Sequence, residues 1–287
     1  MSAIIIDGKA VSSKIKDDVK EKVLNLKLNK GKTITLAVVL IGNDPASEVY
    51  VKNKIKACEY VGIVSQSYRL PENSSQKECE ELIYSLSNDN NIDGILIQLP
   101  LPKHLNEESL LKIIPSHKDV DGLLDENIGK LFQNKKTLIS CTPNGVMQLL
   151  SHYNIDISGK NAVIIGRSNM VGKPMAALLL NANATVTVCH SKTQNLKDFT
   201  KNADILIVAI GRKHFVTADM VKPGATVIDV GINRVDGKLY GDVEFDTVKE
   251  VAGYITPVPG GVGPMTIAML MLNTYLTAEN KIVWFFN

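Results

Sequence analysis

The sequence predicts an α/β protein built from two parallel-sheet domains. Short apolar runs alternate with helical segments in both halves of the chain, and the order β-α-β-α-β is typical of parallel sheets that are covered on both faces. The 287 residues suit two domains of roughly 140 residues each. In the second half, a glycine-containing turn joins a predicted strand directly to a predicted helix, as in Rossmann-type domains.

The first half is expected to contain three strands and two helices. Its apolar runs predict strands over 33–41, 64–70 and 94–99, with helices over 45–61 and 75–87 between them. The polar stretch 133–137 lies between Leu131 and Cys141. We therefore place the domain boundary there.

The second half repeats this pattern. Its expected strands cover 161–165, 184–189, 204–210 and 225–230, and a helix is expected to start at Met175. The last two strands lead into Gly211 and Gly231. A glycine at the carboxyl end of a strand lets the backbone approach a ligand, and ligands bind at that edge of such sheets.

The turn after the strand 161–165 predicts a phosphate site. It has the sequence GRSNMVGKP, residues 166–174, and such a turn points backbone N–H groups and a helix N-terminus at a phosphate. Its spacing is not the usual GxGxxG, because Ser168 stands at the second glycine position and the next glycine is Gly172. A tight turn without any ligand is the alternative.

The next strand favours NADP over NAD. It ends in His190, Ser191, Lys192 and Thr193, where an enzyme that uses NAD usually has an acidic residue for the ribose 2′-hydroxyl. Lys192, together with Arg167 in the glycine turn, suits a 2′-phosphate instead. The second domain is thus predicted to be a Rossmann-type NADP-binding domain. The alternative is that both cations are merely solvated.

Composition excludes several other classes. With 32 Lys+Arg against 30 Asp+Glu, the net charge of +2 indicates neither a nucleic-acid partner nor a membrane surface. No apolar segment approaches the roughly 18 residues of a membrane span. The four cysteines are far apart and fit reduced thiols in the cytoplasm. The five histidines form no cluster with other ligands, so we expect no metal.

Three segments of the first half carry candidates for chemistry. Tyr50 and Lys54 share a helix face with Ser47, by their i, i+3, i+7 spacing. Gln98 interrupts an apolar run, where an amide needs partners, and Asp121 follows on a loop. Each feature alone also fits an ordinary surface pair, cap or turn. Their convergence at one sheet edge favours a site.

The segment 255–264, ITPVPGGVGP, is expected to be a rigid loop. Its prolines fix φ, while its glycines permit unusual φ and close backbone approach. Contact with a ligand and a purely structural turn are the two interpretations. The helix expected over 265–276 is apolar on every side, which predicts burial.

Six motifs together carry a resemblance to a known family. They are YVxxK (50–54), GILIQLPLP (94–102), KDVDG (118–122), CTPxG (141–145), GRS (166–168) and PVPGGVGP (257–264). In order and spacing the chain closely resembles the bifunctional methylenetetrahydrofolate dehydrogenase/cyclohydrolase family. The resemblance implies oxidation of 5,10-methylenetetrahydrofolate by NADP⁺ to the methenyl form, followed by hydrolysis to 10-formyltetrahydrofolate.

The resemblance also implies an architecture. Two domains face each other across a cleft: a folate-binding catalytic domain over 1–138 and an NADP-binding domain over 139–269. A C-terminal helix over 270–287 returns to the first domain, and the protein forms homodimers through the second. Two departures are visible, Ser140 in place of a proline and an unusually apolar tail over 281–287.

The resemblance assigns roles to particular residues. Lys54 becomes the catalytic lysine held by Gln98, Tyr50 stacks on or positions the folate, and Asp121 binds the pterin. The remaining folate-lining residues are Ile97, Leu99, Pro259, Gly260, Gly261 and Gly263. The residues implied to hold NADP are Gly166, Arg167, Ser168, Ser191 and Ile232.

The chemistry fits this division of roles. Hydride loss from a carbon between two nitrogens needs mainly proximity to the nicotinamide, whereas attack by water benefits from a base. Apolar surroundings and a substrate cation favour a neutral Lys54 amine, and Gln98 can hold that amine without adding charge. A dehydrogenase-only or NAD-preferring member of the family, and a folate- or NADP-binding protein without turnover, remain alternatives. Short-chain dehydrogenases and shikimate-dehydrogenase-like enzymes match the motifs less well.

Overall fold

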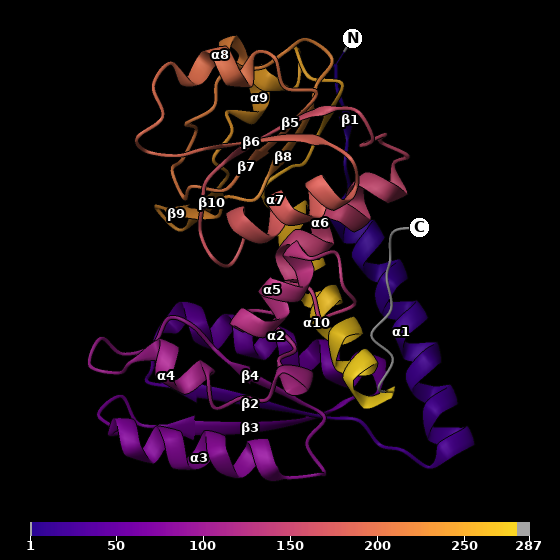
Figure 1. Ribbon diagram of the computed structural model, residues 1–287, viewed down its shortest axis with the longest axis vertical. Helices are drawn as coiled ribbons and strands as arrows, with labels where there is room; N and C mark the ends of the chain where they lie inside the picture. Colours follow the sequence, from indigo (N-terminus) through magenta and orange to yellow (C-terminus); the bar gives the residue numbers. More distant parts are fainter. Residues whose placement is uncertain (1, 280–287) are drawn as a thin grey trace.

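The computed structural model of the protein describes residues 2–279 and contains two α/β bodies joined by helices (Figure 1). The first body contains a three-stranded sheet of order β3-β2-β4, and the second contains a six-stranded sheet of order β1-β11-β8-β7-β5-β6. All neighbouring strands within these two sheets are parallel. The predicted fold class is confirmed.

The elements before residue 133 alternate strand and helix as far as β4, and they include the three strands and two helices that the sequence predicts. In chain order they are β1 (Ile4–Ile5), α1 (Gly8–Lys30), β2 (Thr35–Ile41), α2 (Pro45–Val61), β3 (Val64–Leu70), α3 (Gln76–Asn88), β4 (Gly94–Ile97), α4 (Glu107–Leu111), the 3₁₀ helix η1 (Ser116–Lys118) and α5 (Asp125–Phe132).

The later elements complete the second sheet and return to the first. They are α6 (Cys141–His152), β5 (Asn161–Ile165), α7 (Gly172–Asn181), β6 (Thr185–Cys189), α8 (Leu196–Thr200), β7 (Ile205–Val208), the 3₁₀ helix η2 (Ala218–Met220), β8 (Thr226–Asp229), β9 (Asn233–Val235), β10 (Lys238–Tyr240), α9 (Phe245–Val248), β11 (Tyr254–Ile255) and α10 (Val262–Glu279). Helix α7 begins three residues before the predicted start at Met175, because Gly172 already belongs to its first turn.

Helix α1 is a long element that the sequence interpretation missed. Its N-cap Asp7 accepts a hydrogen bond from the Ala10 N–H at 3.0 Å, and Gly31 ends it with φ of 63°. Most of its residues are polar, and its buried apolar positions are sparse. A weak apolar stripe of this kind is a poor sequence signal, because tertiary packing supplies most of the stability of such a helix.

The N-terminal strand lies in the sheet of the second body, although the first domain is expected to cover 1–138. Strand β1 pairs in parallel with β11, through Ile4 with Tyr254 and Ile5 with Ile255, and so belongs to the sheet of the second body. The chain enters the first body only along α1. Two residues carry too little pattern to show which sheet they join.

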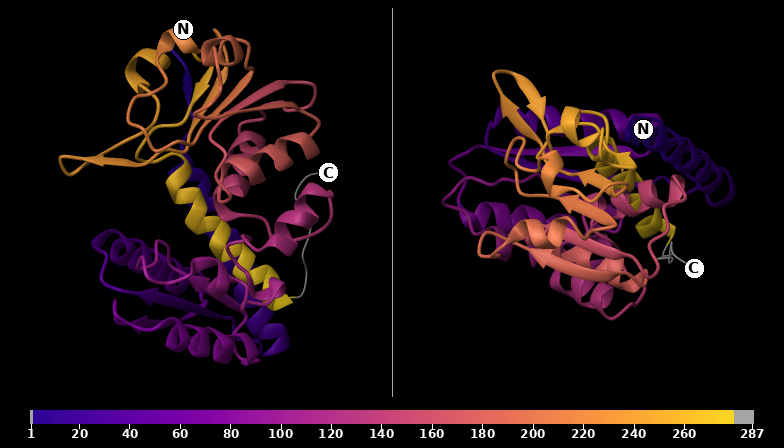
Figure 2. Two further views of the ribbon diagram at one scale, coloured as in Figure 1. Left: turned by 60° about the vertical axis from the view of Figure 1, so that its left-hand side comes forward. Right: turned by 90° about the horizontal axis from the view of Figure 1, so that it is seen from above.

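Helices α1 and α10 lie side by side and connect the two bodies (Figures 1 and 2). Helix α10 is apolar on all sides, and its buried residues pack with those of β2, α1 and α2 in one core. The predicted burial of this helix is confirmed, and its part from 270 to 279 lies in the first body. Residues 280–287, including the apolar tail, lie outside the described part of the chain.

Candidate active site

Lys54 and Gln98 meet at the carboxyl edge of the first sheet. Asp44 caps the N-terminus of α2 by accepting the Ser47 N–H at 2.7 Å, and Pro45 opens the helix, so α2 starts directly after β2. Lys54 is 9% exposed and donates from Nζ to Gln98 Oε1 at 3.0 Å. The sequence placed both residues at this edge, and the structure joins them.

Backbone contacts fix the orientation of the Gln98 amide. Its Nε2 donates to the Leu99 carbonyl at 2.6 Å, and its main-chain N–H donates to the Val39 carbonyl at 2.9 Å. Because Nε2 faces an acceptor, Oε1 is the atom turned toward Lys54. Ile97 is buried and ends β4, so Ile97 and Leu99 flank Gln98 along the chain.

The two aspartates of the KDVDG motif have different environments. Asp119 is 4% exposed and accepts hydrogen bonds from Gly122 N–H, Leu124 N–H and Asn127 Nδ2 at 2.8–3.0 Å. It therefore shapes the loop. Asp121 is half-buried, and its carboxylate acts on the buried Cys141 thiol. Asp121 is thus the more available of the two.

Cys141 connects Lys54 and Asp121 electrostatically. Burial raises the pKa of the Cys141 thiol well above its usual value; the Asp121 carboxylate acts in the same direction, and the Lys54 ammonium opposes it. Cys141 therefore stays a thiol and donates to the Val120 carbonyl at 3.3 Å. Asn273 of α10 donates to the same carbonyl at 2.8 Å, which ties the loop to the last helix. No sequence pattern indicates this contact.

A cavity of about 750 Å³ lies between α2 and the second body. Tyr50 lines it on one side, and the loop 257–264 lines the other. The cavity brings together six residues that the sequence interpretation selected, namely Tyr50, Ile232, Pro259, Gly260, Gly261 and Gly263. Gly260 has φ of 111°, a value that L side chains rarely adopt. Lys54 lies one helical turn after Tyr50.

Several cavity residues were missed by the sequence interpretation. Lys9 and Lys16 come from α1, which was not predicted as a helix, and Asn53, Lys56 and Tyr60 come from α2. Arg234 and Leu239 come from the β9–β10 hairpin. Its two-residue turn, Asp236-Gly237, has positive φ at both positions. An Asp-Gly pair between short strands is a hairpin signal that could have revealed it.

Four of the five predicted cofactor residues, Gly166, Arg167, Ser168 and Ser191, follow the carboxyl ends of β5 and β6 and do not line this cavity. A Cβ on Gly166 would meet the Ala209 carbonyl oxygen at 2.3 Å, and a Cβ on Gly172 would meet the Gly166 carbonyl oxygen at 2.4 Å. Both positions therefore require glycine. Ser168 Oγ accepts from the Val171 N–H at 3.2 Å, so it closes the turn at the place of the second glycine.

The cationic groups near this turn are exposed. Arg167, Ser168, Ser191 and Lys192 are all exposed, and residues 190–193 carry no carboxylate. Arg167 has no hydrogen-bond or ion-pair partner within residues 2–279. Among the predicted cofactor residues, only Ile232 reaches the cavity lined by Tyr50.

Other classes of site were also considered. Within the described residues no group of three or more His, Cys, Asp or Glu is placed to hold a metal ion. All four cysteines are buried and free. None of the helices described is both long and apolar enough to cross a membrane.

A nucleotide-type glycine turn on one α/β body, and a buried lysine of another body beside a shared cavity, define a two-domain nucleotide-dependent enzyme. Family models agree: the tetrahydrofolate dehydrogenase/cyclohydrolase catalytic domain matches residues 6–121, and the NAD(P)-binding domain of the same family matches residues 140–282. The chain belongs to the tetrahydrofolate dehydrogenase/cyclohydrolase family.

Individual relatives match along almost the whole chain. The bifunctional protein FolD of Campylobacter hominis is 56% identical over 279 residues, covering 97% of this chain and 98% of that protein. The crystal structure of FolD from Campylobacter jejuni has a TM-score of 0.95 at 53% identity, with 97% and 99% covered. The Trypanosoma brucei enzyme, crystallised with NADP and an inhibitor, has a TM-score of 0.94 at 37% identity, with 98% of each chain covered.

Proposed function

We propose that the chain oxidises 5,10-methylenetetrahydrofolate with NADP⁺ and hydrolyses the methenyl product to 10-formyltetrahydrofolate. The observation that carries this proposal is the buried Lys54–Gln98 hydrogen bond, one helical turn from a cavity that the second body closes. The relatives are named as bifunctional enzymes of this kind, which supports the extension to this chain.

The residues of the second body fit NADP. Gly166 and Gly172 let the backbone of the turn pack tightly, because a Cβ at either position would collide with a main-chain carbonyl oxygen. A phosphate can approach the N–H groups of such a turn closely. Arg167, Ser191 and Lys192 are exposed beside it, and their donors suit a 2′-phosphate. NADP⁺ bound there would supply the hydride acceptor for the methylene carbon. NADP is therefore favoured over NAD.

The first body supplies the groups for hydrolysis. Tyr50 lies on the cavity wall, where its ring stacks on or positions the folate. Asp121 takes the pterin donors. Lys54, held by the neutral Gln98 amide, accepts a proton from the water that attacks the methenyl carbon. The loop 257–264 and the segment from Ile97 to Leu99 enclose the substrate.

An ultraviolet time course with methylenetetrahydrofolate and NADP⁺ tests the proposal. The buffer is one in which spontaneous hydrolysis of the methenyl product is slow. NADPH that accumulates while methenyl product stays low establishes both activities. NADPH and methenyl product that rise together indicate a dehydrogenase alone. If neither NADPH forms from NADP⁺ nor NADH forms from NAD⁺, the result favours a binding protein without turnover.

The expected assembly is a homodimer through the second body, in the cytoplasm. Strand β6 is an outer strand of the second sheet, and Val188 on it is 38% exposed. Such an edge can pair with another chain. The free buried thiols suit a reducing compartment. Light scattering of the purified protein measures the mass directly, and a monomer at micromolar concentration contradicts the dimer.

A further inference from the structure

Asp242 accepts hydrogen bonds from the backbone that follows β7. It is completely buried. Its Oδ2 accepts the N–H groups of Ile210 at 2.7 Å and Gly211 at 3.0 Å, and its Oδ1 accepts the Arg212 N–H at 2.7 Å. Asn233 adds a fourth donor, Nδ2 to Oδ1 at 2.9 Å. One side chain thereby fixes three consecutive residues after β7 and the start of the β9–β10 hairpin.

Asp229, at the end of β8, also accepts hydrogen bonds from several backbone N–H groups. It is 3% exposed. Its Oδ1 accepts the N–H groups of Gly231 and Asp242, both at 2.9 Å, and its Oδ2 accepts the Val243 N–H at 2.9 Å. The two carboxylates thus share one buried cluster. They join the exit of β8 to the exit of the hairpin.

The glycines beside these carboxylates leave room for them. A Cβ on Gly231 would lie 2.2 Å from the Asp242 carboxyl carbon, and a Cβ on Gly241 would lie 1.8 Å from Asp229 Oδ2. Gly231 also lines the cavity that contains Tyr50, so the expected approach of a ligand at Gly231 stays a prediction. In the structure the space beside its Cα is filled by a buried aspartate.

The cluster lies between the two ligand regions of the second body. Ala209 immediately precedes the segment that Asp242 holds, and its carbonyl oxygen is the atom against which Gly166 of the glycine turn packs. On the other side, Asp229, Gly231 and Ile232 line the cavity that contains Tyr50. A nucleotide that reaches from the glycine turn to this cavity passes the carboxyl ends of β7 and β8.

We propose that Asp242 is a positioning residue for the nicotinamide nucleotide, acting through the backbone of residues 210–212 and through the Asn233 side chain. The inference rests on the proposed function, since it takes NADP as the nucleotide. A carboxylate is required because both oxygens accept from two N–H donors each. An amide at this position would turn its own N–H₂ group toward two of those donors. Either the pair Ile210 and Gly211 or the pair Arg212 and Asn233 would then lose its acceptor.

The test separates nucleotide binding from folate chemistry. Asp242→Asn is compared with Asp246→Asn, which removes an exposed carboxylate of α9. NADPH affinity is measured by fluorescence titration, and hydrolysis of methenyltetrahydrofolate is measured without nucleotide. We expect Asp242→Asn to weaken NADPH binding by ~10–100-fold and to leave hydrolysis within about twofold. Asp246→Asn should match the parent protein in both assays.

Each alternative outcome has a definite meaning. Unchanged NADPH affinity in Asp242→Asn overturns the proposal, and so does an equal loss of affinity and hydrolysis in a folded variant. If that variant does not fold, Asn233→Ala decides, because it removes a single donor to Asp242. Its NADPH affinity should fall while hydrolysis persists, and an unchanged affinity overturns the proposal. Failure of the parent protein to bind NADPH refutes the proposed function instead.

Discussion

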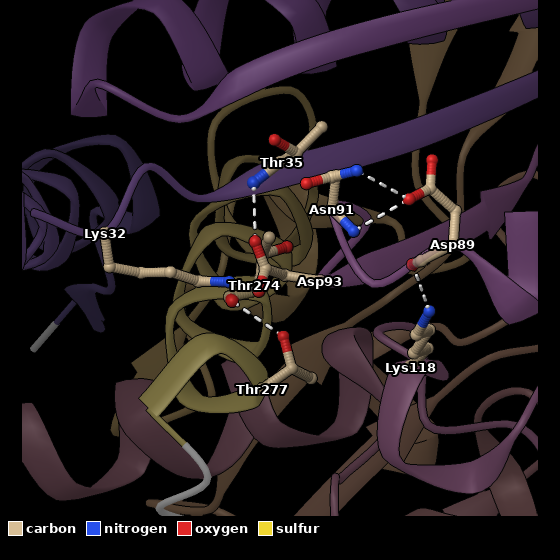
Figure 3. A network of polar contacts seen from close by, with 8 residues as sticks. All are labelled: Lys32, Thr35, Asp89, Asn91, Asp93, Lys118, Thr274 and Thr277. Atoms are coloured by element: carbon tan, nitrogen blue, oxygen red, sulfur yellow. Dashed lines mark hydrogen bonds and ion pairs between the residues drawn. The ribbon is translucent and has the colours of Figure 1, made fainter.

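The two edges of the first sheet each hold a buried lysine, and their partners differ. At the amino edge, Lys118 is 7% exposed, and its Nζ donates to the Ser87 carbonyl at 3.0 Å, in the last turn of α3. It also donates to the Asp89 carbonyl at 2.7 Å, directly after that helix (Figure 3). At the carboxyl edge, Lys54 is 9% exposed, and the Gln98 amide is its one hydrogen-bond partner among the described residues.

The difference lies in how many donors are already used. An ammonium has three donors. Lys118 directs them at carbonyls where α3 ends and the helix dipole is negative, although burial lowers its pKa. In the same region Asp93 accepts from the Thr35 N–H at 2.8 Å and pairs with Lys32 at 2.7 Å (Figure 3). Polar groups at the amino edge are saturated within the fold, whereas the Lys54 amine has one partner within the described chain and stays available to a ligand or to water.

The largest expected effect comes from Lys54→Met. Hydrolysis of methenyltetrahydrofolate should fall by ~10²–10⁴-fold, the usual contribution of a general base. Hydride transfer should fall less, since it depends on proximity rather than on a base. Both rates are measured on the same preparation, with Lys52→Met, an exposed position on α2, as the matched control. An equal loss of both rates in a folded variant refutes the assignment of Lys54 as the hydrolytic base.

Lys118→Met should show the opposite pattern. It leaves the carbonyls at the end of α3 without their buried donor, at about 1–3 kcal/mol for each unsatisfied group. Urea unfolding should therefore report a loss of about 2–4 kcal/mol. Both activities of the folded variant should persist. Lys112→Met is the control, because Lys112 forms an exposed pair with Glu108 that solvent screens, so its loss should barely change stability. A stable but inactive Lys118→Met protein would contradict the contrast between the two edges.

Arg167→Ala extends the comparison to the second body. Its guanidinium has no partner within the described chain, so its removal should leave stability within about 0.5 kcal/mol. The KM for NADP⁺ should rise by roughly 10–100-fold, because a charge-assisted hydrogen bond contributes about 1.5–3 kcal/mol. The KM for NAD⁺ serves as the internal control and should change little. Equal changes for the two cofactors would show that Arg167 does not contact the 2′-phosphate.

The sequence was sufficient for features that depend on local pattern. Strands β2, β5 and β7 are continuous apolar runs, and the i, i+4 spacing placed Tyr50 and Lys54 on one face of α2. Gln98 stood out because an amide in an apolar run needs a partner, and Lys54 is that partner. These features are encoded within a few neighbouring residues.

The features that escaped prediction depend on contacts between distant segments. Asn273 reaches the loop at Val120 across 153 positions of the chain, and Asp242 reaches Ile210 across 32. Neither residue belongs to a recognisable motif. The cavity residues Lys9 and Lys16 were missed for another reason. They belong to α1, whose buried apolar residues are too sparse to show a helical pattern in the sequence. Long-range pairing of single polar side chains leaves no periodicity to detect.

The last expected effect concerns pH and the buried acid Asp229. Desolvation outweighs the N–H donors around Asp229 and, helped by the Asp242 carboxylate, raises its pKa from 3.8 to about 7. Between these values the native state binds more protons than the unfolded state. The stabilisation is therefore fully present below pH 3.8 and is lost as the pH rises toward about 7. Above that value no further change is expected from this group.

Comparison with Asp229→Asn isolates the contribution of Asp229 to the pH dependence of stability, because the amide does not titrate. The unfolding free energy of the parent minus that of the variant should decrease between pH 5 and pH 7 by up to about 1.4 kcal/mol per pH unit, and then level off. Urea titrations at several pH values give this difference. A constant difference across the range would mean that Asp229 stays ionised in the fold, so that its three N–H donors outweigh burial. Asp229 would then resemble Asp93 at the amino edge of the first sheet, where the Thr35 N–H and Lys32 compensate a buried carboxylate.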